Sequence, residues 1–388
     1  MPTRVFTFFF AVLWFLPAVF AFFQLDSYTI STVCIILLFN IAYYVYNNRV
    51  VFTRFFVLLM MLLFSFILIH TIVTRFYFYV GYDLIRNLIS VFFLFIFLLG
   101  LFNFSRVLLF LLSKVINKIF TFFFYFFIFI ILLSFVTRIV DSPYAKPIFP
   151  YPEPSHLSIF FGPVIGYLLI SSQSSKKRLF LLFTGLIISL LIKNMTLLVT
   201  IIILSIFIYN LYVFPILILG GLGMFYFSDL EYFTSRLDFA NMEQTNNLSS
   251  LVYIKGLQLM YEGLSISNGL GIGFQQLGYV PVRTEIGDYI ISIMDGLELN
   301  SHDGGFSAVK IVTEFGVFGL VLMLSYVVYL VKQWMNFKHL SINNLSSNEA
   351  LFFASITTIF SEFFFRGFGY FTASMFLFVT VLFLKKDL

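Results

Sequence analysis

Long apolar runs recur along nearly the whole chain, and no other feature constrains its fold as strongly. A helix needs about 20 apolar residues to cross the hydrocarbon core of a bilayer, and about twelve such runs can be counted here. Because lipid offers backbone groups no hydrogen-bond partners, spanning runs form helices rather than open strands. The sequence therefore predicts an all-α integral membrane protein with about twelve transmembrane helices.

The apolar limits place each expected span to within a few residues. The spans are expected at 5–23, 28–46, 53–73, 84–104, 119–140, 157–172, 178–193, 195–210, 214–228, 306–331, 350–366 and 368–384. Residues 179–227 are almost continuously apolar, and either three short spans or two longer ones fit there. We thus expect N-terminal spans over 1–228, a large polar loop over 229–305 and C-terminal spans over 306–388.

The composition excludes several classes of protein. Of the 388 residues, 61% are hydrophobic and 11% are charged, against roughly 25% charged residues in a soluble domain. These few charges cannot cover a globule whose core would hold so much apolar surface. A soluble enzyme, a disordered protein and a nucleic-acid binder are therefore excluded. The single cysteine, Cys34, and four scattered histidines offer neither a disulfide nor a metal cluster.

The basic residues indicate how the chain is oriented. If both termini are cytoplasmic and the span count is even, 13 of the 23 basic residues fall in short loops on the cytoplasmic side, as the positive-inside rule expects. These residues are Arg4, Arg49, Arg54, Arg106, Lys114, Lys118, Lys176, Lys177, Arg178, Lys332, Lys338, Lys385 and Lys386. Sixteen of the 18 acidic residues then lie on or near the outer side. The alternative is that one mid-chain span is miscounted.

The expected outer side carries one long polar segment, residues 229–305. A loop of this length is usually functional or disordered. Apolar residues recur within it at a helical pitch, at Leu251, Ile254, Leu257 and Leu259. We therefore expect this loop to fold and to be partly helical.

Six arginines also map to the expected outer side. They are Arg75, Arg86, Arg138, Arg236, Arg283 and Arg366. A guanidinium grips phosphate through paired hydrogen bonds and keeps its charge at any working pH. The set favours an anionic ligand, although ordinary ion pairs with the acids of the same face are the alternative.

A motif with a carboxylate and an imidazole precedes the sixth span. It reads Pro152-Glu153-Pro154-Ser155-His156 and ends a proline-rich outer loop, residues 141–156, whose composition predicts a stiff extended segment. Glu153 and His156 at a helix mouth can share a proton or hold a hydroxyl group. A purely structural explanation is equally complete, with Ser155 as the helix cap and Glu153 near the positive end of the helix.

The strongest candidate for chemistry lies around His302, in the run Ser301-His302-Asp303-Gly304-Gly305. An imidazole at the water boundary exchanges protons near neutral pH, and a positioned base contributes about 10²–10⁴-fold in rate. Glu314 lies deeper, where an unpaired charge costs about 2.5–3.5 kcal/mol and marks a functional candidate. Lys310 precedes it by one helical turn, and mutual neutralisation of the two charges is an equally complete explanation of the pair.

The glycine-rich run from Gly269 to Gly278 predicts a tight turn in the outer loop. It is not a dinucleotide fingerprint, because no strand–helix unit surrounds it. Gly271 and Gly273 remain candidates for close approach to a substrate. Glu362 and Arg366 repeat the spacing of Lys310 and Glu314 at the outer end of the eleventh span, with the same ambiguity.

Four pieces of the sequence, in this order, resemble the Wzy-type O-antigen polymerases of Gram-negative bacteria and, more distantly, the O-antigen ligases. The pieces are Glu153-Pro154-Ser155-His156, then Asn247-Leu248-Ser249-Ser250-Leu251 with Tyr253, then Gly269 to Gly278, then Ser301-His302-Asp303 with Glu314-Phe315-Gly316-Val317-Phe318-Gly319. The resemblance covers roughly residues 150–320. Asp303 stands where the ligase-like pattern often has Asn, which favours a polymerase.

The resemblance implies a metal-independent glycosyltransferase with a GT-C-like fold in the bacterial inner membrane. Its donor and acceptor would be oligosaccharides on undecaprenyl diphosphate, joined at the periplasmic face, where the large loop would lie. No cofactor and no nucleic acid are expected; the expected partners are the lipid-linked substrates and membrane lipids, with a polysaccharide chain-length regulator as a further candidate.

The resemblance also suggests roles for individual residues. His302 would act as the base or orient the acceptor hydroxyl, and Arg236 and Arg283 would bind diphosphate or donor sugar. The expected substrate-binding residues are Glu153, His156, Arg138, Glu314, Arg366, Gly271 and Gly273. The rivals are an O-antigen ligase acting on lipid A core, a flippase or transporter, and an assembly partner. Transporters often carry inverted repeats, and none is evident in this sequence.

Overall fold

The computed structural model describes residues 1–23, 28–47, 52–79, 81–139, 148–209, 247–340 and 345–387. These ranges contain fourteen helices and no strand, which confirms the all-α prediction for the described part of the chain. Seven helices are long and apolar enough to cross a membrane. The chain is therefore a multi-pass membrane protein. Some of the other expected spans correspond to helices that are shorter than these seven. One corresponds to a helix of sufficient length that is not among the seven, and the remainder lies outside the described ranges.

The N-terminal helices follow the apolar runs closely. They are α1 (Thr3–Phe22), α2 (Tyr28–Tyr46), α3 (Arg54–Tyr77), α4 (Leu84–Leu109), α5 (Ser113–Ile139), α6 (Pro154–Ser171), α7 (Ser175–Leu191) and α8 (Met195–Tyr209). The two short helices α7 and α8 agree with a division of the apolar stretch after residue 179 into short segments. The expected span at 214–228 lies outside the described residues.

The C-terminal part begins inside the long polar segment. Its helices are α11 (Leu248–Ile266), α12 (Glu285–Ile293), α13 (Ser307–Phe315), α14 (Val317–Lys338), α15 (Ser347–Phe364) and α16 (Ala373–Asp387). The expected single span at 306–331 is wrong, because α13 and α14 are separate helices joined at Gly316. Gly316 has φ 59°, and a Cβ there would lie 2.0 Å from the Gly269 carbonyl oxygen. Glycine is required at this break because no side chain fits.

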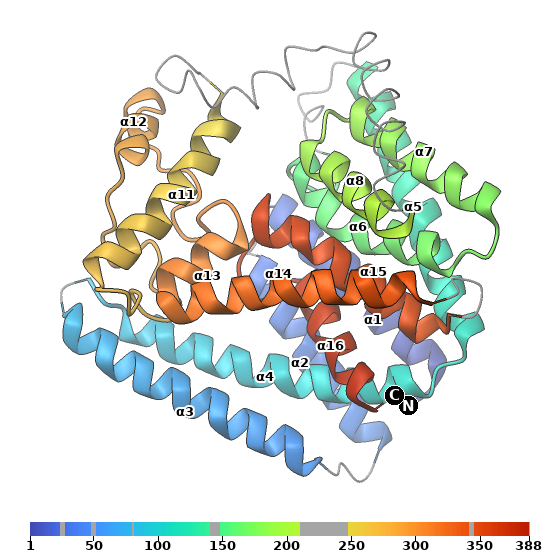
Figure 1. Cartoon of the computed structure of the whole chain (residues 1–388), viewed down its shortest axis with the longest axis horizontal. Helices are drawn as coiled ribbons and strands as arrows, with labels where there is room; N and C mark the ends of the chain where they lie inside the picture. Colours follow the sequence, from blue (N-terminus) through green and yellow to red (C-terminus); the bar gives the residue numbers. More distant parts are fainter. Residues whose placement is uncertain are drawn as a thin grey trace.

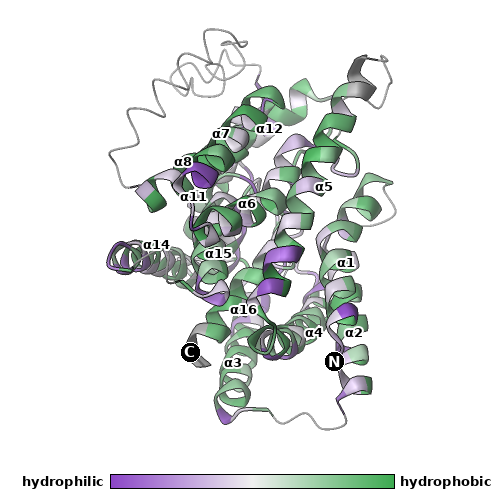
Figure 2. Ribbon diagram, turned by 90° about the vertical axis from the view of Figure 1, so that its right-hand side faces the viewer, coloured by the Kyte–Doolittle hydropathy of each residue, from purple (hydrophilic) through white to green (hydrophobic). Residues whose placement is uncertain are grey.

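Helices α6 and α15 form the centre of the bundle. In α6, 83% of the membrane-length window is buried, compared with 22% in α3 and in α14. Gly162 and Gly166 face Thr358 of α15, and a Cβ at Gly166 would meet its methyl group at 3.1 Å. Small residues of this kind let two membrane helices approach closely. The outer helices expose many large apolar side chains, and Figure 2 shows that most residues of the helices are hydrophobic.

The described part of the long polar segment folds at one end of the bundle. In Figure 1, α11, α12 and α13 lie together beside the place where α3 ends and α4 begins. Leu251, Ile254 and Leu259 are buried on α11, as their spacing predicts, whereas Leu257 is 47% exposed. Leu251 also forms a small separate core with Ile290 of α12. The prediction of a partly helical loop is thus confirmed for residues 247–305.

Candidate functional site

Arg366 lies just beyond the end of α15 and joins two distant parts of the chain. Its Nη2 lies 3.1 Å from Glu153 Oε2 and 3.1 Å from His156 Nε2, at the start of α6. Its Nη1 lies 3.4 Å from Asn300 Oδ1, in the loop that carries His302. The Arg366 side chain is 14% exposed and that of Glu153 is 53% exposed, so water reaches the pair.

The start of α6 sets the positions of Glu153 and His156. Pro154 occupies the first turn, where the missing N–H costs nothing and the fixed φ suits a helix. Ser155 is not the helix cap, contrary to one explanation of the motif. Glu153 is the N-cap residue without a side-chain cap bond, and the Ser155 hydroxyl instead donates to Glu153 Oε2 at 3.0 Å. The carboxylate is thereby held toward Arg366.

His156 is buried and held on both ring nitrogens. Because the Arg366 guanidinium can only donate, His156 Nε2 accepts and its Nδ1 faces the Tyr28 hydroxyl at 3.2 Å. Phe368 packs edge-on against the imidazole at 4.3 Å and stacks on the Tyr28 ring at 4.5 Å. The imidazole is therefore neutral in this arrangement, and its orientation is fixed by both partners.

His302 is exposed, and its ring position leaves one nitrogen available. Nδ1 lies 3.2 Å from the Leu277 carbonyl oxygen, which can only accept, so Nδ1 carries the proton and Nε2 keeps a free lone pair. The ring packs on Tyr279 at 5.1 Å, and Arg86 donates to the Tyr279 hydroxyl at 2.8 Å. Gly278 permits this contact, since a Cβ there would lie 2.3 Å from His302 Nδ1.

The His302 loop and the Arg366 cluster are directly connected. Asn300 accepts from Arg366, and the Gly367 N–H donates to the Gly305 carbonyl at 3.2 Å. The loop containing His302 is therefore fixed on both sides to the segment after α15. This places Glu153, His156 and the His302 loop at the same end of the helical body.

Glu314 lies at the centre of a second, fully buried cluster. Its carboxylate accepts the backbone N–H of Gln275 at 2.8 Å, that of Leu277 at 3.2 Å and the Tyr370 hydroxyl at 2.6 Å. The Lys310 ammonium lies 4.0 Å away. Burial raises the pKa of the Glu314 carboxyl, while Lys310 and these hydrogen bonds oppose the rise. Glu314 thus anchors the glycine-rich loop to α13.

The spacing of Lys310 and Glu314 indicates only that their charges neutralise each other, but in the structure Lys310 also binds a second loop. Its Nζ donates to the backbone carbonyl of His302 at 2.7 Å, and the side chain is buried. It also lies over the Tyr370 ring at 5.6 Å. The pair therefore holds two loops at once, the glycine-rich loop through Glu314 and the His302 loop through Lys310.

The packing around Gly271 and Gly273 is enough to explain why both positions require glycine, without any bound ligand. Both have positive φ, and a Cβ at Gly271 would lie 2.4 Å from the Glu314 carbonyl oxygen. A Cβ at Gly273 would lie 2.8 Å from the Tyr82 ring. The predicted tight turn is confirmed, and the role of these glycines in substrate binding stays a prediction.

Of the other predicted arginines, the structure brings Arg86 to Tyr279, beside His302, but it does not bring Arg283 into this cluster. Arg283 is exposed before α12 and forms no hydrogen bond or ion pair with another described residue. Arg138 belongs to α5, but its side chain is not described, and Arg236 lies outside the described residues. Within the described ranges, Arg366 is the arginine joined to the other candidate residues.

Sequence reasoning missed four residues that build this end of the molecule. Tyr28, Asn300 and Tyr279 contact His156, Arg366 and His302 as described above. Asn300 directly precedes the motif that contains His302, and its position was a usable signal. His70 of α3, one of the four scattered histidines, is buried and binds the Leu270 carbonyl at 2.9 Å, so it supports the glycine-rich loop.

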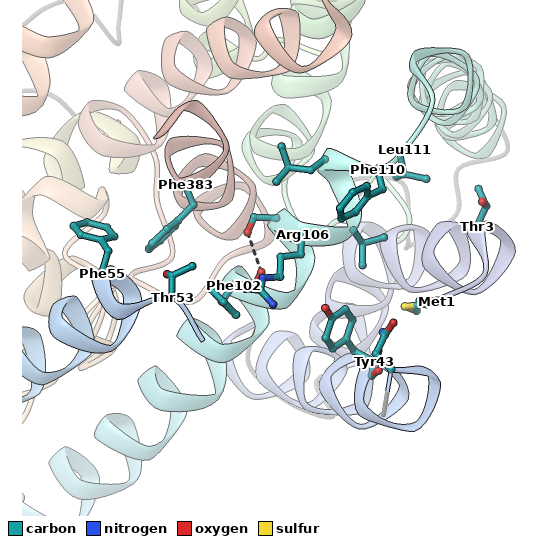
Figure 3. A pocket seen from close by; sticks show the side chains of 14 residues that line it. Met1, Thr3, Tyr43, Thr53, Phe55, Phe102, Arg106, Phe110, Leu111 and Phe383 are labelled. Carbon is teal, nitrogen blue, oxygen red and sulfur yellow. Dashed lines mark hydrogen bonds between the residues drawn. The ribbon is translucent and has the colours of Figure 1, made fainter. Parts of the chain in front are cut away.

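A pocket of about 540 Å³ lies away from these residues. Figure 3 shows its lining, which includes Thr3 of α1, Tyr43 of α2, Thr53 before α3 and Arg106 near the end of α4. The candidate site instead contacts the start of α4, through Arg86. The pocket therefore lies at the opposite end of α4, and none of the predicted site residues lines it.

Comparisons with known proteins do not assign a family. No protein-family model, no curated protein and no solved structure matches the chain. Within the part of the chain that the structure describes, no group of three or more His, Cys, Asp or Glu residues is arranged to hold a metal ion. The functional argument therefore rests on the motif residues themselves and on the geometry given above.

Proposed function

We propose that this chain is an O-antigen polymerase. It transfers a growing glycan from undecaprenyl diphosphate onto a new lipid-linked repeat unit, at the periplasmic face of the bacterial inner membrane. The observation that carries the proposal is the convergence of the four motif pieces, which lie far apart in the sequence, at one end of a helical membrane protein.

Each piece of the motif contacts another piece or a shared residue. Arg366 bridges the Glu153–His156 piece and the His302 loop, and Glu314 binds the glycine-rich loop. The second piece joins through Tyr253, whose ring stacks on Phe306 at 4.9 Å, immediately after the His302 loop. Residues that act on one substrate must meet in space in this way.

The proposed reaction forms one glycosidic bond and breaks one bond to phosphate. The acceptor hydroxyl oxygen attacks the anomeric carbon of the donor glycan, and the bond from that carbon to the diphosphate breaks. His302 Nε2 takes the hydroxyl proton, because its Nδ1 is occupied by the Leu277 carbonyl. The diphosphate leaves with its electron pair, and fixed cations stabilise its developing charge.

Arg366 is the best placed cation for this task among the described residues. Its Nε lacks a hydrogen-bond partner among them, and its ion-pair partner Glu153 is half exposed, so water can take the place of Arg366 at this carboxylate when a phosphate binds the guanidinium. The neutral His156 beside it, with both ring nitrogens engaged, orients the Arg366 guanidinium toward the substrate. Arg236 and Arg283 keep their predicted role in binding the donor, and Arg138 and Glu314 their role in supporting the substrate.

The test is the lipopolysaccharide ladder of a strain that lacks the gene and is complemented with variants. His302→Ala should slow polymerisation by about 10²–10⁴-fold, which leaves mainly single repeat units on the core. His339→Ala is the matched control, because His339 is exposed at the end of α14 and contacts none of the candidate residues.

The outcome also separates the rival functions. A strain that loses a polymerase still attaches one repeat unit to the lipid A core, whereas a strain that loses a ligase attaches none. A full ladder from His302→Ala at normal expression would exclude His302 as the base. The absence of any attached repeat in the gene deletion would contradict the polymerase proposal itself.

A further inference from the structure

A small cavity with both polar and apolar lining residues lies inside the helical body, between α6, α15 and the start of α16. Its volume is about 10 Å³, which is about the space that one water molecule or one small ion needs. Oxygen atoms dominate its polar lining, from Ser158, Ser355, Thr358, Ser361, Glu362 and Ser374. Serine and threonine are common where membrane helices pack closely, whereas a buried ionisable residue such as Glu362 is costly there.

Glu362 supplies the only carboxylate of this cavity, and it lacks a cationic partner. It is 1% exposed and accepts hydrogen bonds from Thr372 and Ser374. Arg366 lies one turn further along, but it pairs with Glu153 instead. Among the described residues, no Lys, Arg or His nitrogen forms an ion pair with Glu362. Burial of a carboxylate without a balancing charge is strongly unfavourable.

The hydroxyl groups around the cavity offer mainly lone pairs to an occupant. Ser158 and Thr358 donate their protons to backbone carbonyls of their own helices, and Ser374 donates to Glu362. A hydroxyl that has used its proton can only accept or coordinate. The occupant that these groups suit is therefore a cation or a hydrogen-bond donor.

Ser355 gives a second and independent indication of an occupant. Its side chain is 2% exposed, lines the cavity and has no hydrogen-bond partner within the described part of the chain. An unpaired buried hydroxyl costs free energy unless a bound species contacts it. The cavity thus contains a buried hydroxyl group without a partner as well as a buried carboxyl group without a cation beside it among the described residues.

We propose that this cavity binds a single sodium ion, with Glu362 as the anionic ligand and the surrounding hydroxyl oxygens completing its shell. Hard cations prefer oxygen ligands, and a dry site with one carboxylate suits a monovalent ion. A water molecule fits the volume, but only a cation would also stabilise the ionised form of Glu362. The ion connects α6, α15 and α16, and it lies one helical turn from Arg366.

The test measures the melting temperature of the purified chain in lipid nanodiscs, in sodium chloride and in choline chloride at equal ionic strength. A ligand that binds only the folded state raises the melting temperature in a saturable way. Sodium should do so and choline should not. Glu362→Gln should abolish the difference. Glu349→Gln, which changes an acid in the first turn of the same helix, should retain it.

A second variant keeps the test decisive if Glu362→Gln folds poorly. Ser355→Ala removes a hydroxyl that has no partner in the fold, so the protein should fold normally. The sodium concentration that gives half of the maximal rise in melting temperature should be about tenfold higher for this variant. Loss of a group that supports a metal site typically weakens metal binding by at least this factor. Equal melting temperatures in the two salts would overturn the proposal and leave water or a proton as the occupant. A sodium response that is unchanged in both variants would overturn it as well.

Discussion

Two polar clusters at the same end of the molecule differ in how fully their members are satisfied. Around Glu314, each polar group is bound to another part of the chain, and all of them except the half-buried Tyr370 are buried. Around Arg366, the paired carboxylate of Glu153 is half exposed and one guanidinium nitrogen lacks a partner. A satisfied buried cluster fixes loops in place, whereas an unsatisfied and partly exposed one can exchange its partners for a ligand.

This difference has an energetic consequence. The loss of one partner from a buried charge network leaves the other charges in a medium that solvates them poorly. The loss of a partner from an exposed pair is compensated by water. Substitutions around Glu314 should therefore act mainly on stability, and substitutions around Arg366 mainly on activity.

The largest effect is expected for Glu314→Ala. It leaves Lys310 and two backbone N–H groups buried without their acceptor, so stability should fall by about 3–5 kcal/mol. Thermal melting of the purified protein measures this loss. The control Asp288→Ala removes an exposed acid on α12 and should change stability by no more than about 0.5 kcal/mol. Similar melting temperatures for the two variants would mean that Glu314 is not the anchor.

A smaller effect, and one on activity alone, is expected for Arg366→Lys. A lysine keeps the charge but cannot reach Glu153, His156 and Asn300 together, so the polymerisation rate should fall at least about tenfold. The melting temperature should stay close to that of the unchanged protein. The control is Arg54→Lys at the start of α3, which should keep the full ladder. A loss of stability without a loss of rate would reverse the comparison.

The smallest effect is expected for Tyr370→Phe, which removes one hydrogen bond to Glu314 and should cost about 1 kcal/mol. Burial and the nearby Glu314 raise the pKa of Tyr370 well above its usual value, so its hydroxyl stays protonated. Because the pKa of Tyr370 is raised in the folded state, the stability that its hydrogen bond contributes is fully present below the usual tyrosine pKa. It is lost only as the pH rises above that value. The melting difference should thus be constant from pH 6 to pH 9, roughly.

The matched control for this variant is Tyr261→Phe, since Tyr261 is 70% exposed on α11. Its melting temperature should not change measurably. If the Tyr370→Phe difference varies across the neutral range, Glu314 rather than Tyr370 titrates there, and the buried cluster is less completely satisfied than its geometry indicates.

Helix positions were predictable from the sequence wherever an apolar run had clear polar ends. The expected span at 28–46 coincides with α2, for example. The prediction failed at 306–331, because a single glycine inside an apolar run gives no signal of its own. The break at Gly316 exists because the glycine-rich loop packs directly against that backbone, which is a contact between distant residues.

The sequence likewise identified which residues are candidates for the site, but it did not predict which of them contact each other. Glu153, His156 and His302 stood out from their apolar surroundings, and their motifs predicted a shared function. The preference for Arg236 and Arg283 over Arg366 had no support from spacing, because six arginines map to the same side. Only the packing of α15 against α6 brings Arg366 to Glu153.

The sequence by itself determined that the chain is helical and lies in a membrane, since apolar segments in lipid must satisfy their backbone groups internally. It also determined which residues are chemically exceptional. Only the tertiary structure decided which of them meet. Arg366 and His156 are 210 residues apart in the chain, and their contact depends on how helices distant in sequence pack together. Periodicity reports the face of one helix, and it carries no information about which other helix that face will meet.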